Sequence, residues 1–123
     1  MDKHELISRT RKFAIQVFKL VERLPKSEAA KVVAYQLLRS SSSVAANYRA
    51  ANRAKSKADF LNKIKIVLEE ADESNFWIVF IGDVELLVKE DKELNLLIKE
   101  SDELTASFTT SLKTSNQQKN LTS

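Results

Sequence analysis

Cysteine is absent from this chain of 123 residues, and glycine, proline and histidine occur once each. The absence of cysteine excludes disulfides, zinc knuckles and thiol nucleophiles. Average usage would supply about fifteen glycines and prolines in a chain of this length. Their scarcity argues against barrels, sandwiches, Rossmann units and P-loops, whose turns and phosphate-binding loops need glycine. A helical protein is therefore expected.

Long hydrophobic runs are also missing. No stretch approaches the roughly 18 consecutive apolar residues that a membrane-spanning helix needs. The first residues, MDKHELISRTRKF, lack the apolar segment of a signal peptide. We therefore expect no membrane segment and a cytoplasmic location. The apolar share of 43% is enough to fill the core of one domain.

Candidate catalytic groups are few. A carboxylate-bridged di-iron bundle needs Glu-x-x-His on two helices, and His4 is the only histidine. Clustered carboxylates such as Glu69, Glu70 and Glu73 fit a solvated helix face better than an active site. We therefore expect no catalytic residue, metal ligand or cofactor, and a protein that is not an enzyme.

Apolar and small residues recur at spacings of three and four, which is the period of an amphipathic helix. The repeating positions are Leu6, Phe13, Val17, Leu20 and Leu24; Ala30, Leu37, Val44 and Ala51; Phe60, Ile64, Val67, Ala71, Ser74, Ile78 and Ile81; and Leu94, Leu97, Ser101, Leu104, Phe108 and Ser111. The pattern predicts an all-α, antiparallel up-down-up-down four-helix bundle over residues 1–113. Its helices are expected at about 3–23, 27–54, 56–81 and 88–113. The polar residues 114–123 are expected to form a flexible tail.

The few helix-breaking and capping residues support these boundaries. Pro25 cannot lie inside a helix without the loss of a hydrogen bond. Ser27 and Ser56 are suitable N-caps for the second and third helices. Gly82 is expected to end the third helix, because glycine adopts the left-handed conformation at low cost.

The charge is divided between the two halves of the chain. Residues 1–57 carry a net charge of +9 and residues 58–123 carry −6, although the whole chain carries only +3. One interpretation is that the basic and acidic helices pair within the bundle, and surface ion pairs of that kind stabilise little. The other is a basic face for nucleic-acid phosphates. The candidate residues for that face are Arg9, Arg11, Lys12, Arg49, Arg53, Lys55 and Lys57.

The aromatic residues of the third helix lie away from its apolar stripe. Residues 76–81 are apolar around most of the helix, and such a segment must be covered on all sides. The cover is either the loop after Asp83 or another subunit, and we favour the subunit. Phe76, Trp77 and Phe80 are therefore candidate interface residues of a homo-oligomer.

Asn47 is the one polar residue that we expect to be buried. It lies on the inner side of the second helix, so its amide should be hydrogen-bonded. The third helix is a candidate location for its partner.

Three segments together carry a family resemblance: residues 43–54 (SVAANYRAANRA), residues 56–64 (SKADFLNKI) and residues 70–77 (EADESNFW). They resemble the four-helix bundle family that includes proteins encoded in intervening sequences of bacterial 23S rRNA genes. The family usually has glycine near position 45 and glutamate at position 50, where this chain has alanine.

This resemblance implies a small non-enzymatic bundle that forms a ring-shaped homopentamer. The chain is also similar to the accessory variability protein of diversity-generating retroelements, a basic pentameric bundle that binds nucleic acid and a reverse transcriptase. In such an assembly, Arg49 and Arg53 are expected to face Glu70 and Glu73, with a contact between subunits as the better fit to their spacing.

Two function classes follow from these observations. The first is an accessory module that binds RNA or DNA through phosphate contacts on the basic face. The alternative is a structural or protein-interaction module without nucleic-acid binding. Salt-dependent nucleic-acid binding distinguishes them, because phosphate contacts release counterions and weaken steeply as salt rises.

Overall fold

The computed structural model describes the backbone of residues 1–122 and the side chains of residues 1–115. Four helices make up the chain: α1 (Lys3–Val21), α2 (Glu28–Ala51), α3 (Lys57–Asp83) and α4 (Lys92–Thr122). No strand occurs within these residues. The predicted all-α class is therefore confirmed.

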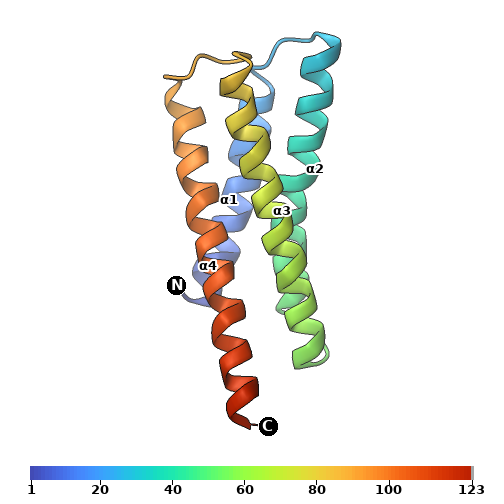
Figure 1. The fold of residues 1–123 in the computed structure, drawn as a ribbon. Helices are drawn as coiled ribbons and strands as arrows, with labels where there is room; N and C mark the ends of the chain where they lie inside the picture. Colours follow the sequence, from blue (N-terminus) through green and yellow to red (C-terminus); the bar gives the residue numbers. More distant parts are fainter. Residues whose placement is uncertain (123) are drawn as a thin grey trace.

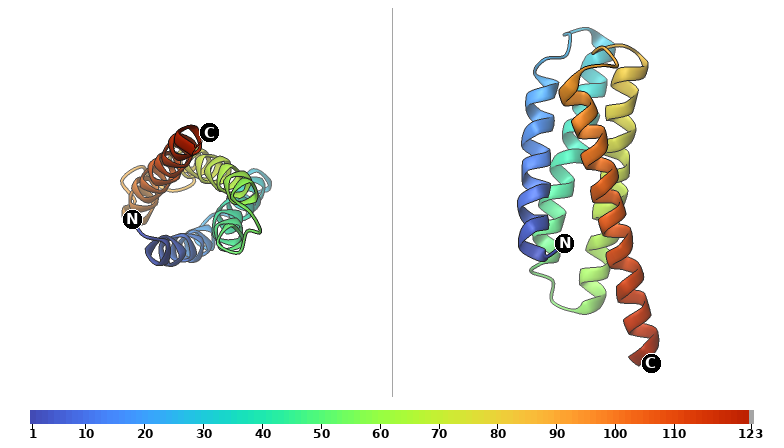
Figure 2. Two further views of the ribbon diagram at one scale, coloured as in Figure 1. Left: turned by 90° about the horizontal axis from the view of Figure 1, so that it is seen from below. Right: turned by 90° about the vertical axis from the view of Figure 1, so that its left-hand side faces the viewer.

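The helices form an antiparallel up-down-up-down bundle (Figure 1). Each helix packs against the next one along the chain, and α4 closes the bundle against α1. The α2–α3 pair is the most extensive and the α1–α4 pair the least. Seen along the axis, α1 and α3 occupy opposite corners (Figure 2). The N-terminus and the α2–α3 turn lie at the same end of the bundle, and α4 extends beyond that end (Figure 2).

Short side chains cap the helices at their N-termini. The Asp2 carboxylate accepts from the Glu5 amide at 2.8 Å, and Ser27 accepts from Ala30 at 3.2 Å. Ser56 accepts from the amide of Asp59 at 3.1 Å. The two serine caps predicted from the sequence are confirmed. Each cap satisfies a donor that the helix itself leaves without a partner.

The core follows the repeating stripe. All the stripe positions of α1 and α2 named above are buried, as are those of α3 from Ile64 to Ile81 and of α4 from Leu94 to Phe108. Phe60 and Ser111, at the outer ends of their stripes, are half-buried. Tyr48 and Phe108 meet with ring centroids 5.5 Å apart, which joins α2 to α4 inside the bundle.

The end of α3 corrects the prediction for Gly82. Gly82 is a buried residue inside the helix, and no glycine has a positive φ. The left-handed position is taken by Glu85, with φ of 59°. The Glu85 amide donates to the carbonyl of Gly82 and the Leu86 amide donates to the carbonyl of Ile81, which is the Schellman pattern of helix ends. Gly82 instead allows a close approach, because a Cβ there would lie 3.3 Å from Leu94 Cδ2.

The bounds of α4 also differ from the prediction. The helix begins at Lys92 rather than near residue 88, because the Asp91 carboxylate accepts from the Leu94 amide at 3.0 Å and caps it. It continues to Thr122, beyond the predicted end at residue 113, so most of the predicted tail is helical. Whether residues 114–123 are flexible stays a prediction. Residue 123 and the side chains of residues 116–122 lie outside the described part.

Candidate nucleic-acid interface

Four basic residues lie together where α2 ends and α3 begins. Arg49 is in the last turn of α2, Arg53 and Lys55 are in the connection, and Lys57 is the first residue of α3. All four are exposed. Arg53 lies in the turn directly after α2, where its backbone amide donates to the carbonyl of Ala50 at 3.0 Å. We call these four residues the basic end.

Carboxylates do not neutralise the basic end. Among residues 1–115, none of its four cationic groups forms an ion pair. Asp59, the carboxylate next to it in sequence, is bound by Lys63 at 2.6 Å and accepts from the backbone amide of Lys55 at 3.2 Å. The hydrogen bond from Lys63 holds the pKa of Asp59 below its usual value, with a smaller effect of the Lys55 amide. Asp59 thus stays charged beside Lys63.

Arg9 is not part of this exposed set, contrary to the sequence prediction. Its guanidinium binds two carboxylates of α4: Nε donates to Glu100 at 3.0 Å and Nη2 donates to Glu103 at 2.8 Å, with a further contact from Nη2 to Glu100. The hydrogen bond with Glu100 is the main reason that the pKa of Arg9 is raised. Arg9 is therefore a bridge between α1 and α4 and is not available to a phosphate.

Arg11 and Lys12 are exposed but lie apart from the basic end. They are on α1 and, as consecutive residues of a helix, point about 100° away from each other. Arg11 lies about 12 Å along the helix from its first residue. The structure therefore brings together four of the seven predicted residues and leaves these two on the outer surface of α1.

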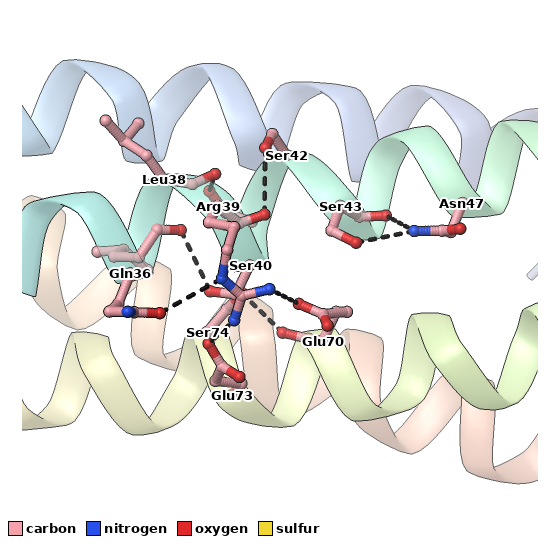
Figure 3. A network of polar contacts seen from close by, with 12 residues as sticks. Gln36, Leu38, Arg39, Ser40, Ser42, Ser43, Asn47, Glu70, Glu73 and Ser74 are labelled. Atoms are coloured by element: carbon pink, nitrogen blue, oxygen red, sulfur yellow. Dashed lines mark hydrogen bonds and ion pairs between the residues drawn. The ribbon is translucent and has the colours of Figure 1, made fainter.

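Arg39 is a structural residue that sequence reasoning missed (Figure 3). It projects from α2 and binds both Glu73 and Glu70 of α3, the latter at 3.4 Å, while its Nε donates to Gln36 at 3.3 Å. The hydrogen bond with Glu73 raises the pKa of Arg39. The sequence contained a signal for this pair. Arg39 lies about as many residues before Lys55, in the turn between α2 and α3, as Glu70 lies after it, and antiparallel helices place such residues at the same level.

Glu70 and Glu73 have a partner within the chain, and their predicted contact with Arg49 and Arg53 of another subunit stays a prediction. Arg49 and Arg53 were expected to face these glutamates from another subunit. Within one chain both carboxylates are already bound by Arg39, and neither Arg49 nor Arg53 approaches a described carboxylate within 4.0 Å. The guanidinium groups of Arg49 and Arg53 are thus available to another partner.

Arg23 makes a third bridge at the opposite end of the bundle. It binds Asp91 and, at 3.1 Å, Glu93, and so connects the α1–α2 turn to the start of α4. The hydrogen bond from Arg23 lowers the pKa of Asp91, and the Leu94 amide adds to that effect. Asp91 therefore caps α4 and anchors Arg23 at once.

The sequence left two interpretations of the charge division, pairing inside the bundle and an unpaired basic face, and the structure contains residues of both kinds. Arg9, Arg23 and Arg39 pair with acidic residues of α3 and α4 or of the α3–α4 turn, as internal neutralisation requires. The basic end has no such partner among residues 1–115. The basic end is thus one part of the bundle surface where positive charge has no carboxylate partner.

Asn47 is half-buried, and its hydrogen bonds stay inside α2 (Figure 3). Its amide nitrogen donates to the carbonyl and the hydroxyl oxygen of Ser43 at 3.0 and 2.8 Å. The expected full burial is wrong, and the third helix does not supply its partner. Inside the bundle, buried serines make a polar contact between α2 and α3, with Ser74 donating to Ser40 at 3.1 Å.

The predicted interface aromatics form one cluster on α3. Phe76 contacts Trp77 edge-on at 4.9 Å between ring centroids and stacks on Phe80 at 5.9 Å. Trp77 and Phe80 are half-buried against the core, whereas Phe76 keeps 56% of its surface exposed. The loop after Asp83 therefore does not cover this face. Trp77 Nε1 is buried without a hydrogen-bond partner among the described residues.

A hollow of about 500 Å³ lies near the N-terminus, lined by Leu6, Phe60 and hydroxyl-bearing residues of α4 such as Ser107 and Thr110. Its described lining carries no carboxylate, imidazole or thiol. Within the described part of the chain, no three acidic, histidine or cysteine side chains are grouped so that they could hold a metal ion. None of the described helices is both long and apolar enough to cross a membrane.

Comparisons with known proteins agree with the fold. A family model described as 23S rRNA-intervening sequence protein matches residues 2–110. The chain is also similar to the 1.70 Å crystal structure of a protein of unknown function from the S23 ribosomal protein family of Bacteroides thetaiotaomicron VPI-5482. The two are 30% identical over 88% of this chain and 98% of that one, with a TM-score of 0.80. A search of the curated proteins finds no match. The chain belongs to the 23S rRNA-intervening sequence protein family.

Proposed function

We propose that this protein is a non-enzymatic accessory module of the cytoplasm that binds nucleic acid through its basic end. The observation that carries the proposal is the set of four exposed cations at the α2–α3 turn, none of which is paired within residues 1–115. The other arginines that contact carboxylates bridge helices and are already neutralised. Cations without a partner are the groups that can replace the counterions of a phosphate backbone.

The basic end offers phosphate contacts and no base recognition. The exposed aromatic rings Phe18, Tyr35 and Phe76 lie on other parts of the surface, and Tyr48, the aromatic residue nearest to Arg49 in sequence, is buried. Phe60, three residues after Lys57, is half-buried, so the basic end presents no exposed aromatic ring on which a base could stack. Binding is therefore expected to be independent of sequence and to depend strongly on salt.

The test measures binding of a fluorescent 20-base-pair DNA duplex by anisotropy in 50 to 200 mM KCl. Four phosphate contacts predict a slope of about −3.6 for log K against log salt, which is a loss of roughly 100-fold over this range. The double variant Arg53→Gln/Lys57→Gln should reduce the slope by about 1.8. The control Lys31→Gln/Lys99→Gln removes two other exposed lysines and should keep the slope.

Two results would contradict the proposal. One is the absence of binding at 50 mM KCl by the correctly folded protein. The other is an equal loss of affinity in the control and in the Arg53→Gln/Lys57→Gln variant. The first result would favour the alternative, a structural or protein-interaction module without nucleic-acid binding. The second would show that nucleic acid binds elsewhere on the surface and not through the basic end.

We also propose that the module is a homo-oligomer, with the pentamer as the number implied by the family resemblance. The exposed Phe76 side chain, supported by Trp77 and Phe80, favours this assembly, because apolar side chains gathered on a surface mark interaction sites. Light scattering at micromolar concentration should give a mass well above the 14.0 kDa of one chain. A monomer would contradict this assembly. A protein partner and the likeness to the retroelement accessory protein stay predictions.

A further inference from the structure

The outer surface of α1 carries apolar side chains inside a basic border. Ile15 and Phe18 are large apolar side chains that are 44% and 54% exposed. Arg11, Lys12 and Lys19 lie beside them and form no ion pair with any residue of the range 1–115, and the nearby Glu22 pairs with Lys26 at 3.9 Å. These cations span about 12 Å along the helix. We call these five residues the basic face of α1.

The outer surface of α3 has the opposite charge around a similar apolar centre. Phe76 and Val79 are 56% and 36% exposed. Glu69, Asp72 and Asp83 lie near them, and no ion pair engages these three carboxylates within the described side chains. We call these five residues the acidic face of α3.

The acidic face is also hollowed. A depression of about 330 Å³ is lined by Asp72, Asn75, Phe76, Val79, Phe80 and Asp83. Its lining combines three apolar side chains with two carboxylates and the amide of Asn75. A large apolar side chain that arrives with positive charges around it fits such a site.

One copy of the chain cannot bring its two faces together. Helices α1 and α3 stand at opposite corners of the bundle, and their backbones are not adjacent (Figure 2). The two faces therefore point in different directions and are available to two different neighbours. Contact between unlike patches of identical chains is heterologous, and it gives a closed ring or an open filament, depending on the rotation between copies.

Charge decides which pairs of faces can meet. Two basic faces would place three cations against three cations, and two acidic faces would place carboxylates against carboxylates. Juxtaposed like charges cost several kcal/mol in protein interfaces. Only the unlike pair combines apolar burial with opposite charges. A second copy of this chain carries the complement of each face, so no other partner chemistry is needed.

We propose that the basic face of α1 in one copy docks on the acidic face of α3 in the next, with Phe18 seated in the hollow beside Phe76. This contact rests on the proposed homo-oligomer and specifies how its copies meet. It leaves the basic end at the α2–α3 turn outside the contact, so every copy of the assembly keeps its nucleic-acid surface.

The test uses two variants, one in which the basic face of α1 is blocked and one in which the acidic face of α3 is blocked. Phe18→Glu and Phe76→Glu each place an unpaired carboxylate at the apolar centre of the contact, and both positions are exposed, so each variant should fold. Each variant alone should be a monomer by ultracentrifugation. An equal mixture should form a complex of two chains and stop there, because the intact acidic face of one variant fits the intact basic face of the other.

A charge exchange provides an independent measurement. The double variant Arg11→Glu/Lys19→Glu should dissociate the oligomer, and the further changes Asp72→Lys/Asp83→Lys in the same chain should restore it. Tyr35→Glu is the matched control, because Tyr35 is an exposed aromatic residue of α2 that belongs to neither face. It should assemble like the unmodified chain. Circular dichroism confirms that each variant is folded.

The outcomes separate this inference from the proposed assembly. An unmodified chain that is monomeric at tens of micromolar contradicts the oligomer and this contact together. An oligomer that persists in Phe18→Glu, or variants that stay monomeric when mixed, contradict only the contact between α1 and α3. Nucleic-acid binding by the basic end is measured separately and does not depend on either result.

Discussion

Replacement of Glu85 by glycine is expected to stabilise the protein. Glu85 has φ of 59°, a left-handed conformation that costs an L-residue roughly 1–2 kcal/mol. Glycine adopts this conformation freely. It also makes the unfolded chain more flexible, which lowers the free energy of unfolding by about 0.4–1 kcal/mol. Glu85 is exposed, and its side chain forms no hydrogen bond with the described residues. The net gain in the free energy of unfolding is therefore about 0.5–1 kcal/mol.

The two hydrogen bonds that end α3 should persist in this variant. They are made by the backbone amides of Glu85 and Leu86, at 3.2 and 3.0 Å from their acceptors. Glycine at position 85 retains the backbone amide. Urea unfolding is the appropriate assay. With a slope of about 1–3 kcal/mol per molar urea, the midpoint should rise by a few tenths molar.

Two controls isolate the conformational cause. Glu85→Ala keeps the left-handed strain and should bring no such gain. Gly82→Ala improves helix propensity by about 1 kcal/mol, but the added Cβ would lie 3.3 Å from the buried Leu94 side chain, so we expect the gain to be offset. Equal midpoints for Glu85→Gly and Glu85→Ala would refute the reasoning.

Three further predictions concern the core and the turns. Phe108→Ala should lower the free energy of unfolding by about 3–5 kcal/mol, because the ring is fully buried against Tyr48; a loss below 1 kcal/mol by urea unfolding would contradict this. Ser74→Ala should lower the free energy of unfolding by about 1 kcal/mol, and by more than Asn47→Ala does, because of these two residues only Ser74 donates a hydrogen bond to another helix. Equal losses for the two variants in urea unfolding would contradict this. The lowered pKa of Asp91 means that its stabilising effect is present above the ordinary pKa of about 4 and is lost as the pH falls through the lower folded value. Asp91→Asn should therefore lose less stability than the unmodified chain between pH 5 and pH 2, and identical acid profiles would contradict the pairing with Arg23.

Local sequence signals determined the helices and their core. The spacing of three and four places one stripe of each helix inward, and the stripe from Ile64 to Ile81 is buried throughout. Ser27 and Ser56 were identified as caps because an N-cap depends on residues within three positions of it. Such features can be read from a sequence because their causes lie within one helix.

The end of α3 depended on the rest of the bundle. Glycine near the end of a helical pattern is usually a C-terminal stop, yet Gly82 lies inside the helix, where the side chain of Leu94 comes close. The turn then places Glu85 in the left-handed conformation. The demand for a small residue came from α4, which no local pattern around Gly82 reveals.

Pairings between helices were decided only by the tertiary structure. Arg9, Arg23 and Arg39 look like Arg49 and Arg53 in the sequence, yet the first three are bound by carboxylates and the other two are not bound among the described residues. The difference comes from the level of each residue along the bundle axis and from the helix face on which it lies. A shift of a few residues in the packing of neighbouring helices would exchange paired and unpaired cations. Composition therefore determined how much positive charge the first half of the chain carries, and helix packing decided which part of it remains available to a partner.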